Sequence, residues 1–107
     1  MSLHSVSLTW SSPEFGQVRR YDVWRAEGSF PTLQSVVLAV KQNPSLFKNL
    51  TAPNGIQPIS PATTPLKTFT DINVKNKTTY TYFITQTNKQ GVQSPASDPP
   101  TVFKVVF

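Results

Sequence analysis

The sequence predicts an all-β fold, a Greek-key β-sandwich, and two observations carry this prediction. Stretches in which apolar and polar residues alternate recur along the chain, and clusters of Ser, Pro, Gly and Asn separate them. Residues 69–85 contain two such stretches, joined by the polar run 75–79 that leads into Tyr80. In Greek-key sandwiches, a tyrosine at such a corner bonds through its hydroxyl to the backbone upstream. At 107 residues the chain is long enough for one domain, so we expect residues 1–107 to form a single unit.

The first predicted strand covers residues 6–10, where apolar and polar side chains alternate strictly. Because successive side chains of a strand point to opposite faces, Val6, Leu8 and Trp10 are expected to face the core. The turn-forming residues 11–13 end the strand.

The second predicted strand covers residues 20–27 and ends at the turn-forming residues 27–29. The same alternation directs Tyr21 and Val23 to the core. Trp24 then lies on the opposite, outward face of the strand.

The third and fourth predicted strands flank the corner. Residues 67–72 form the third strand, with Phe69 directed inward, and residues 80–87 form the fourth. The inward side chains of the fourth strand are Tyr80, Tyr82 and Ile84. Tyr80 stands at the corner, so we expect its hydroxyl to be bonded to the backbone a few residues upstream.

A hairpin turn is expected at residues 88–91, because Gly91 supplies the positive φ that such a turn requires. Residues 93–100 are rich in proline and are expected to form an edge or linker-like segment, since proline cannot donate to a β-ladder. The last predicted strand covers residues 101–107.

Residues 29–66 interrupt this pattern and are expected to form a long Pro-rich insertion, which holds six of the ten prolines. Within it, Val36 and Val40 recur at helical spacing, but residues 35–40 are rich in β-branched side chains. We therefore expect a short strand or one helical turn there. The second half of the insertion, residues 49–66, is expected to lie on the surface as an extended loop.

The basic composition of the chain is not organised as a binding stripe. Ten Lys and Arg stand against five Asp and Glu, for a formal charge of +5, but only Arg19, Arg20 and Arg25 lie close together in sequence. No nucleic-acid partner is therefore expected. The chain has no cysteine for a disulfide or a thiolate metal site, and no apolar run of membrane-helix length, so no membrane insertion is expected.

Catalytic residues, cofactors and bound metals are not expected. Acid–base catalysis needs titratable groups held together in a cleft. The side chains that could serve show no pairing in the sequence: His4, Glu14, Asp22, Glu27, Asp71 and Asp98. Asp71 is expected to brace the corner turn, and the strand carboxylates Asp22 and Glu27 are expected to be solvated. We therefore expect that the chain is not an enzyme.

Taken together, five stretches resemble a fibronectin type III domain, of the kind found as repeats in bacterial surface and polysaccharide-degrading proteins. The stretches are Leu8-Thr9-Trp10, Tyr21-Asp22-Val23-Trp24-Arg25, Phe69-Thr70-Asp71, Thr79-Tyr80-Thr81-Tyr82-Phe83-Ile84 and Asn88-Lys89-Gln90-Gly91-Val92-Gln93-Ser94-Pro95-Ala96-Ser97. They lie within residues 6–27 and 67–106. The resemblance implies an immunoglobulin-like sandwich.

Three departures from the family pattern matter. The first family strand should precede Val6, but only residues 1–5 do, so that strand is expected to be short or missing. Residues 1–5 are expected to be an expression leader or a remnant of that first strand. Gln86 stands where the family keeps a small apolar residue, and the insertion at residues 29–66 is longer than the family needs.

Trp24 and Phe83 face outward on strands that pair in this family, and two arrangements are open. In the first, the insertion folds over both rings and makes a second small core. The covering side chains would be Phe30, Leu46 or Phe47. In the second, Trp24 and Phe83 form an exposed platform for a sugar ring or a neighbouring domain, and Arg25 supplies a hydrogen-bond donor at its edge.

The resemblance implies a non-catalytic spacer or protein-interaction module from a larger multidomain bacterial protein, extracellular or at the cell surface. Its partners would be the neighbouring domains of the parent polypeptide, with a protein or a polysaccharide as ligand. The alternative is a carbohydrate-binding accessory domain that uses Trp24 and Phe83 for stacking.

Overall fold

The computed structural model describes residues 5–10, 18–57, 67–93 and 100–107. Their secondary-structure elements are β1 (Val6–Thr9), β2 (Val18–Glu27), α1 (Leu33–Gln42), β3 (Lys48–Asn49), β4 (Thr68–Asp71), β5 (Thr78–Asn88) and β6 (Thr101–Val105). Four sequence predictions lie outside the described residues: the leader, the loop after the first strand, the end of the insertion and most of the Pro-rich edge segment.

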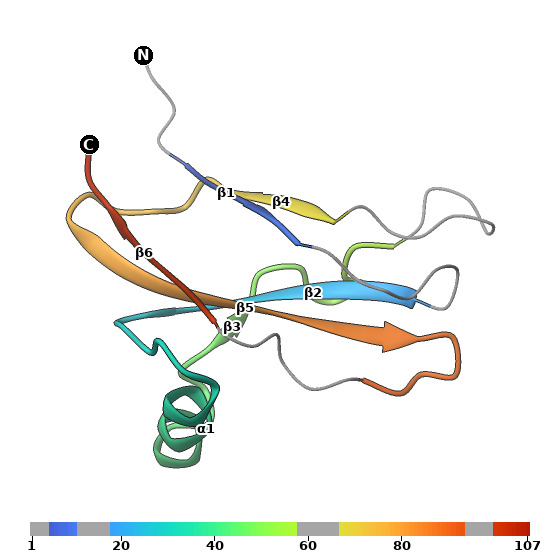
Figure 1. Cartoon of the computed structure of the whole chain (residues 1–107). Coiled ribbons are helices and arrows are strands. Elements are labelled where there is room, and N and C mark those ends of the chain that lie inside the picture. Colours follow the sequence, from blue (N-terminus) through green and yellow to red (C-terminus); the bar gives the residue numbers. More distant parts are fainter. Residues whose placement is uncertain (1–4, 11–17, 58–66, 94–99) are drawn as a thin grey trace.

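The strands form two antiparallel sheets that pack on one another, and helix α1 lies on the far side of the larger sheet (Figure 1). The smaller sheet consists of β1 and β4, and the larger sheet has the strand order β3-β2-β5-β6. The predicted mostly-β architecture with two packed sheets is confirmed at this level. Helix α1 is an addition to it.

One apolar cluster fills the space between the sheets. Its buried members are Val6, Val23, Tyr80, Tyr82 and Val105. Partly buried side chains packed against them include Leu8, Trp10, Phe69 and Ile84. Tyr21 is also buried, and its ring meets Trp10 edge-on at a centroid distance of 5.5 Å. The side chains that alternation directs inward therefore lie in this cluster or against it.

Tyr80 occupies the corner between β4 and β5. Its hydroxyl accepts a hydrogen bond of 2.9 Å from the backbone amide of Lys75, which is the contact predicted for this tyrosine. The backbone amide of Asn73 donates to Asp71 Oδ1 at 3.1 Å, so Asp71 braces the turn as expected. Lys77 adopts a positive φ of 59° and turns the chain into β5.

Beside the corner, Arg25 of β2 forms the ion pair that joins the two sheets. Its Nη1 lies 2.8 Å from Asp71 Oδ2 on β4, and its guanidinium carbon lies 5.0 Å from the ring centroid of Tyr80. The hydroxyl of Tyr82 donates to the same carboxylate oxygen at 2.7 Å. Burial and the hydrogen bond to Asp71 raise the pKa of Tyr82, so its hydroxyl remains a donor. The Arg25–Asp71 ion pair therefore has further hydrogen-bond partners, which a buried ion pair requires.

Helix α1 differs from the sequence prediction, which favours a short strand or one helical turn over residues 35–40. The side chain of Thr32 accepts the amide of Ser35, and Ser35 Oγ accepts the amide of Thr32, both at 3.1 Å. This capping box offsets the lower helix propensity of the valines. The helix ends before Asn43, whose successor Pro44 disfavours helical backbone.

The predicted surface loop over residues 49–66 also needs correction in its described part. β3 forms an antiparallel ladder with β2, and Ile56 exchanges backbone hydrogen bonds of 2.8 and 3.0 Å with Tyr21. Leu50 and Ile56 pack against the main core. The segment is held to β2 because it gains both ladder bonds and burial of its apolar side chains.

The smaller sheet leaves part of the larger sheet uncovered. Phe103 pairs with Tyr80 in the β5–β6 ladder, so both side chains point to the inner face of the larger sheet. Phe103 is nevertheless 49% exposed, whereas Tyr80 is 1% exposed. Among the described residues, β1 pairs with β4 alone. β6 ends at Val105 instead of the predicted residue 107.

Tyr80→Phe is expected to lower the free energy of unfolding by about 1–3 kcal/mol, because it leaves the amide of Lys75 without its acceptor. Tyr21→Phe is the matched control. Tyr21 is equally buried, but its hydroxyl has no hydrogen-bond partner in the described part of the chain. Its removal should leave the stability unchanged or raise it. Urea unfolding measures both variants, and equal losses would contradict the assigned corner.

Candidate binding site

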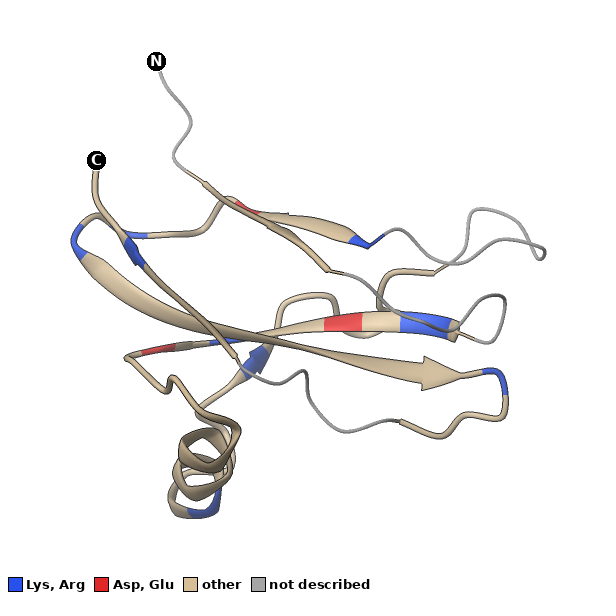
Figure 2. Ribbon diagram, in the orientation of Figure 1, with Lys and Arg blue, Asp and Glu red and all other residues tan. Residues whose placement is uncertain are grey.

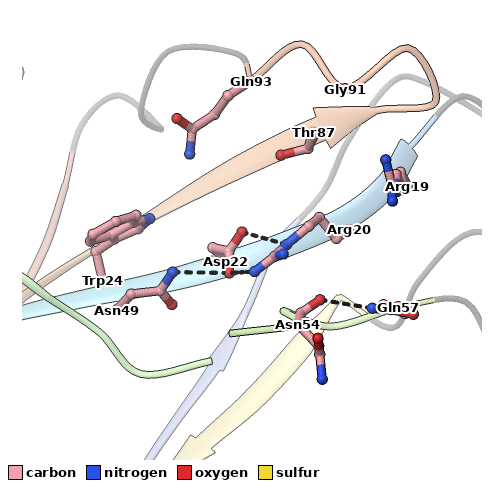
Figure 3. A pocket seen from close by; sticks show the side chains of 10 residues that line it. All are labelled: Arg19, Arg20, Asp22, Trp24, Asn49, Asn54, Gln57, Thr87, Gly91 and Gln93. Atoms are coloured by element: carbon pink, nitrogen blue, oxygen red, sulfur yellow. Dashed lines mark hydrogen bonds and ion pairs between the residues drawn. The ribbon is translucent and has the colours of Figure 1, made fainter. Parts of the chain in front are cut away.

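A pocket of about 480 Å³ opens on the outer face of the larger sheet (Figure 3). β2 forms its floor, and its walls come from residues 49–57 and from the hairpin after β5. The lining residues are Arg19, Arg20, Asp22, Trp24, Asn49, Asn54, Gln57, Thr87, Gly91 and Gln93. The volume lies within the range of about 300–1,000 Å³ that is usual for small-molecule sites. The lining is almost entirely polar, which suits a hydroxylated or charged ligand.

The hairpin that forms one wall has the predicted turn. Gly91 adopts a φ of 85°, and its amide donates to the carbonyl of Asn88 at 3.0 Å. Asn88 Oδ1 accepts the backbone amide of Val92 at 2.9 Å, which fixes the turn. A bridge between Thr87 and Gln93 then brings Gln93 back over the sheet.

The alternation of β2 brings Arg20, Asp22 and Trp24 to the pocket, because these residues share the outer face of the strand. The prediction that Asp22 is a solvated charge is wrong, since the residue is only 4% exposed. It is buried because the wall formed by residues 49–57 closes over it.

A β-bulge adds Arg19 to the same face. Val18 pairs with Asn88, but Arg20 pairs with the adjacent Thr87, so Arg19 is an extra residue in β2. Strict alternation would direct Arg19 toward the core. A bulge re-aims the side chain at its position, and this one places Arg19 in the pocket lining beside Arg20.

Asp22 organises the pocket floor. Arg20 donates to it twice, from Nε to Oδ2 at 2.9 Å and from Nη2 to Oδ1 at 2.6 Å. Asn49 Nδ2 and the Thr51 hydroxyl also lie within hydrogen-bond distance of Oδ1, at 3.1 and 2.9 Å. Three of these contacts fall on Oδ1 and one falls on Oδ2, so the carboxylate is held in place from β2 and from residues 49–51.

The hydrogen bonds also decide the charge of Asp22. Burial acts to raise the pKa of its carboxyl group, but the hydrogen bonds from Arg20, Thr51 and Asn49 outweigh burial. The pKa is therefore held below its ordinary value. The group is ionised at neutral pH and forms a fixed ion pair with Arg20.

Arg20 is held from a second side by the wall. Its Nη1 donates to the carbonyl of Pro53 at 2.8 Å. Gly55 lies against the guanidinium with a φ of 68°, and a Cβ at this position would overlap side-chain atoms of Arg20. Only glycine combines this backbone conformation with so close an approach.

Trp24 and Phe83 are partners in the β2–β5 ladder, and their rings stack with an interplanar angle of 9° and a centroid distance of 5.8 Å. Phe83 also contacts Phe47, with centroids 4.9 Å apart. Buried Ala26, Val36 and Phe47 form a second apolar cluster against which both rings pack. The covered arrangement is therefore the correct one, and the insertion makes a second small core.

The exposed platform of Trp24, Phe83 and Arg25 is not formed. Arg25 lies on the inner face of β2, where it pairs with Asp71, because alternation separates it from Trp24. Part of the Trp24 side chain remains accessible, since it lines the pocket. Its indole Nε1 donates to Thr85 Oγ1 at 2.9 Å, which fixes the ring at one end of the pocket (Figure 3).

Each described carboxylate is joined to a cation: Asp22 to Arg20 at 2.6 Å, Asp71 to Arg25 at 2.8 Å and Glu27 to Lys75 at 2.7 Å. The other candidates, His4, Glu14 and Asp98, lie outside the described residues. Within the described ranges, no three metal-ligating side chains gather into a group that could hold an ion. No helix in these ranges has the length and apolar character needed to cross a membrane.

Basic side chains are spread over strands, turns and the helix (Figure 2). On β2, however, two arginines and Asp22 lie together in the pocket lining. Sequence patterns do not reveal this pocket, because its walls come from segments far apart in the chain. One local signal exists: Arg20 and Asp22 are two residues apart in a strand, which places opposite charges on one face.

Comparison of the chain with protein-family models, with curated proteins and with solved structures finds no match. The fold and the pocket therefore carry the functional assignment.

Asp22→Asn is expected to lower the free energy of unfolding by about 1.5–3 kcal/mol at neutral pH, because Arg20 loses its charged partner. The folded-state pKa of Asp22 lies below the unfolded value of about 3.9. Its contribution is therefore fully present above that value and is lost as the pH falls through the folded pKa. Urea unfolding at a series of pH values should show the difference between the two proteins narrowing in acid.

Glu27→Gln is the matched control, since it makes the same change in an exposed carboxylate beside Lys75. Exposed ion pairs are screened by solvent, so little loss of stability is expected. Equal losses in the two variants, or a difference that does not depend on pH, would show that Asp22 does not organise the pocket floor.

Proposed function

We propose that this chain is a fibronectin type III-like domain that acts as a non-catalytic interaction module of a larger, extracellular bacterial protein. The strand order supports this fold. In immunoglobulin-like sandwiches the second and fifth strands share one sheet, and the third, sixth and seventh share the other. β1 and β4 correspond to the first group and β2, β5 and β6 to the second, and no strand of the described residues corresponds to the first family strand. The corner tyrosine agrees with this assignment, as does β1, which pairs with β4 alone in the described ranges.

The observation that carries the binding function is the pocket with its fixed floor. Asp22 and Arg20 are bonded to one another and to the wall, so the floor has its shape before a ligand arrives. A site that is already ordered loses little conformational entropy on binding. A carboxylate held in an ion pair is a weak base, which favours binding over chemistry.

The partners of such an interaction module would be a neighbouring domain, another protein or a polysaccharide that reaches the pocket face.

A second function, carbohydrate binding, is favoured by the composition of the pocket. The amide side chains of Asn54, Gln57 and Gln93 line it, with Trp24 at one end. Amides both donate and accept hydrogen bonds, which matches the hydroxyl groups of sugars. The ligand would border Trp24 where the indole lines the pocket, since Phe83 stacks on one face of the ring.

Titration of the isotope-labelled chain with soluble oligosaccharides tests this function by NMR. The panel consists of cello-, xylo- and chito-oligosaccharides and uronic-acid oligomers. We expect reversible shifts gathered at Trp24 and Gln93, with no change in oligosaccharide length. Gln93→Ala should weaken binding about two- to tenfold, the worth of one neutral hydrogen bond. Gln42→Ala on α1 is the matched control and should bind normally.

If the oligosaccharides become shorter during the titration, and if changing one carboxylate abolishes this cleavage, the chain is an enzyme and not a non-catalytic interaction module. Shifts confined to the far side of the sandwich would place the binding site elsewhere. Absence of shifts with every sugar would remove the carbohydrate candidate and leave proteins as the ligand class.

A further inference from the structure

One positive charge in the pocket has no counter-charge among the described residues. The charge of Arg20 is matched by Asp22, with which it forms an ion pair. Arg19 is exposed, and it forms no ion pair within the described part of the chain. Two arginines and one aspartate line the pocket, so it presents one net positive charge to a ligand.

The bulge in β2 determines where this charge lies. Figure 3 shows Arg19 at the end of the pocket opposite Trp24. Without the bulge, alternation would turn Arg19 toward the core, and the pocket would be neutral. The pocket therefore has an indole at one end and, at the other, a guanidinium that forms no ion pair with any described residue.

Two glutamine amides also line the pocket. Gln93 Nε2 donates to Thr85 Oγ1 at 3.1 Å, and Gln57 Nε2 donates to the carbonyl of Asn54 at 3.0 Å. These bonds orient both amides and leave their Oε1 atoms as acceptors. Such acceptors suit hydroxyl protons, which a sugar supplies in number.

We infer that the pocket binds a glycan that carries carboxylate groups, a chain containing uronic acid. This inference rests on the proposed carbohydrate-binding function and names its sugar class. Arg19 pairs with the carboxylate, because a guanidinium matches its geometry with two parallel hydrogen bonds. Gln57 and Gln93 accept hydroxyl protons of the same or the adjoining sugar, and Trp24 borders the ring.

The test compares trisaccharides of galacturonate, glucuronate and mannuronate with their methyl esters, which keep the sugar and remove the charge. Calorimetry on the whole chain measures affinity, and the indole N–H resonance of Trp24 reports the site. The chain has two tryptophans, so a Trp10→Phe variant identifies that resonance. We expect at least one acid to bind about tenfold or more tightly than its ester, with affinity that falls as salt is added.

Arg19→Gln should abolish the preference for the acid. Lys41→Gln on α1 is the matched control, because it removes the same charge from an exposed residue outside the pocket. It should leave the preference intact. Both positions are exposed, so neither change is expected to affect folding.

The remaining outcomes overturn the inference in different ways. Equal binding of acid and ester would refute the uronic-acid assignment and leave the carbohydrate function standing. No binding of any acid, ester or neutral sugar would refute both. Equal losses in Arg19→Gln and Lys41→Gln would mean that net charge alone attracts the ligand. A glutamate tripeptide that binds as tightly as the sugars would identify an acidic peptide as the ligand.

Discussion

The alternation of side chains along β2 is the constraint on which most of the molecule depends. Its inner face directs Val23 and Arg25 to the space between the sheets, and its outer face directs Asp22 and Trp24 to the pocket and the second core. A slip of one residue against β5 would exchange the two sets and bring Asp22 into the apolar cluster. When one face of a strand is solvated, only the side chains of the other face specify its register. Side chains on both faces of β2 are packed or hydrogen-bonded, so both faces specify its register.

Two ion pairs on opposite faces of β2 tie distant parts of the chain to this strand. On the inner face, Arg25 reaches Asp71 on β4 and joins the two sheets. On the outer face, Asp22 pairs with Arg20 and receives donors from residues 49–51. Removing one partner of such a pair would leave a buried charge without its bonds, which is costly. The pairs therefore favour the observed arrangement of segments against β2, while the apolar clusters supply most of the driving force.

Local patterns predict those parts of the structure that depend on neighbours in sequence. The corner of Tyr80 and the turn of Gly91 follow from a few adjacent residues, and both are found as predicted. For α1 the prediction leaves a short strand or one helical turn open and misses the full helix, because its valines favour a strand and its burial depends on Phe47, which follows the helix. The burial of Asp22 is also missed, because the segment that covers it, with the donors Asn49 and Thr51, is distant in sequence and shows no local sign of pairing with β2. The pocket is thus a product of long-range contacts.

The two adjacent arginines of the pocket have different roles: Arg20 holds the floor in place, and Arg19 faces the ligand. Arg20 is held by Asp22 and by the carbonyl of Pro53, so it cannot turn toward a ligand without breaking these bonds. Arg19 has no such bonds among the described residues and can reach an incoming group. Because Arg20 neutralises Asp22, that carboxylate repels an anionic ligand only weakly and leaves the charge of Arg19 effective. The hydrogen bonds between residues 49–53 and β2 keep Arg20 and Asp22 paired. The net charge of the pocket is therefore that of Arg19. Shape and electrostatic preference have the same origin, in the bulge and the ion pair at the start of β2.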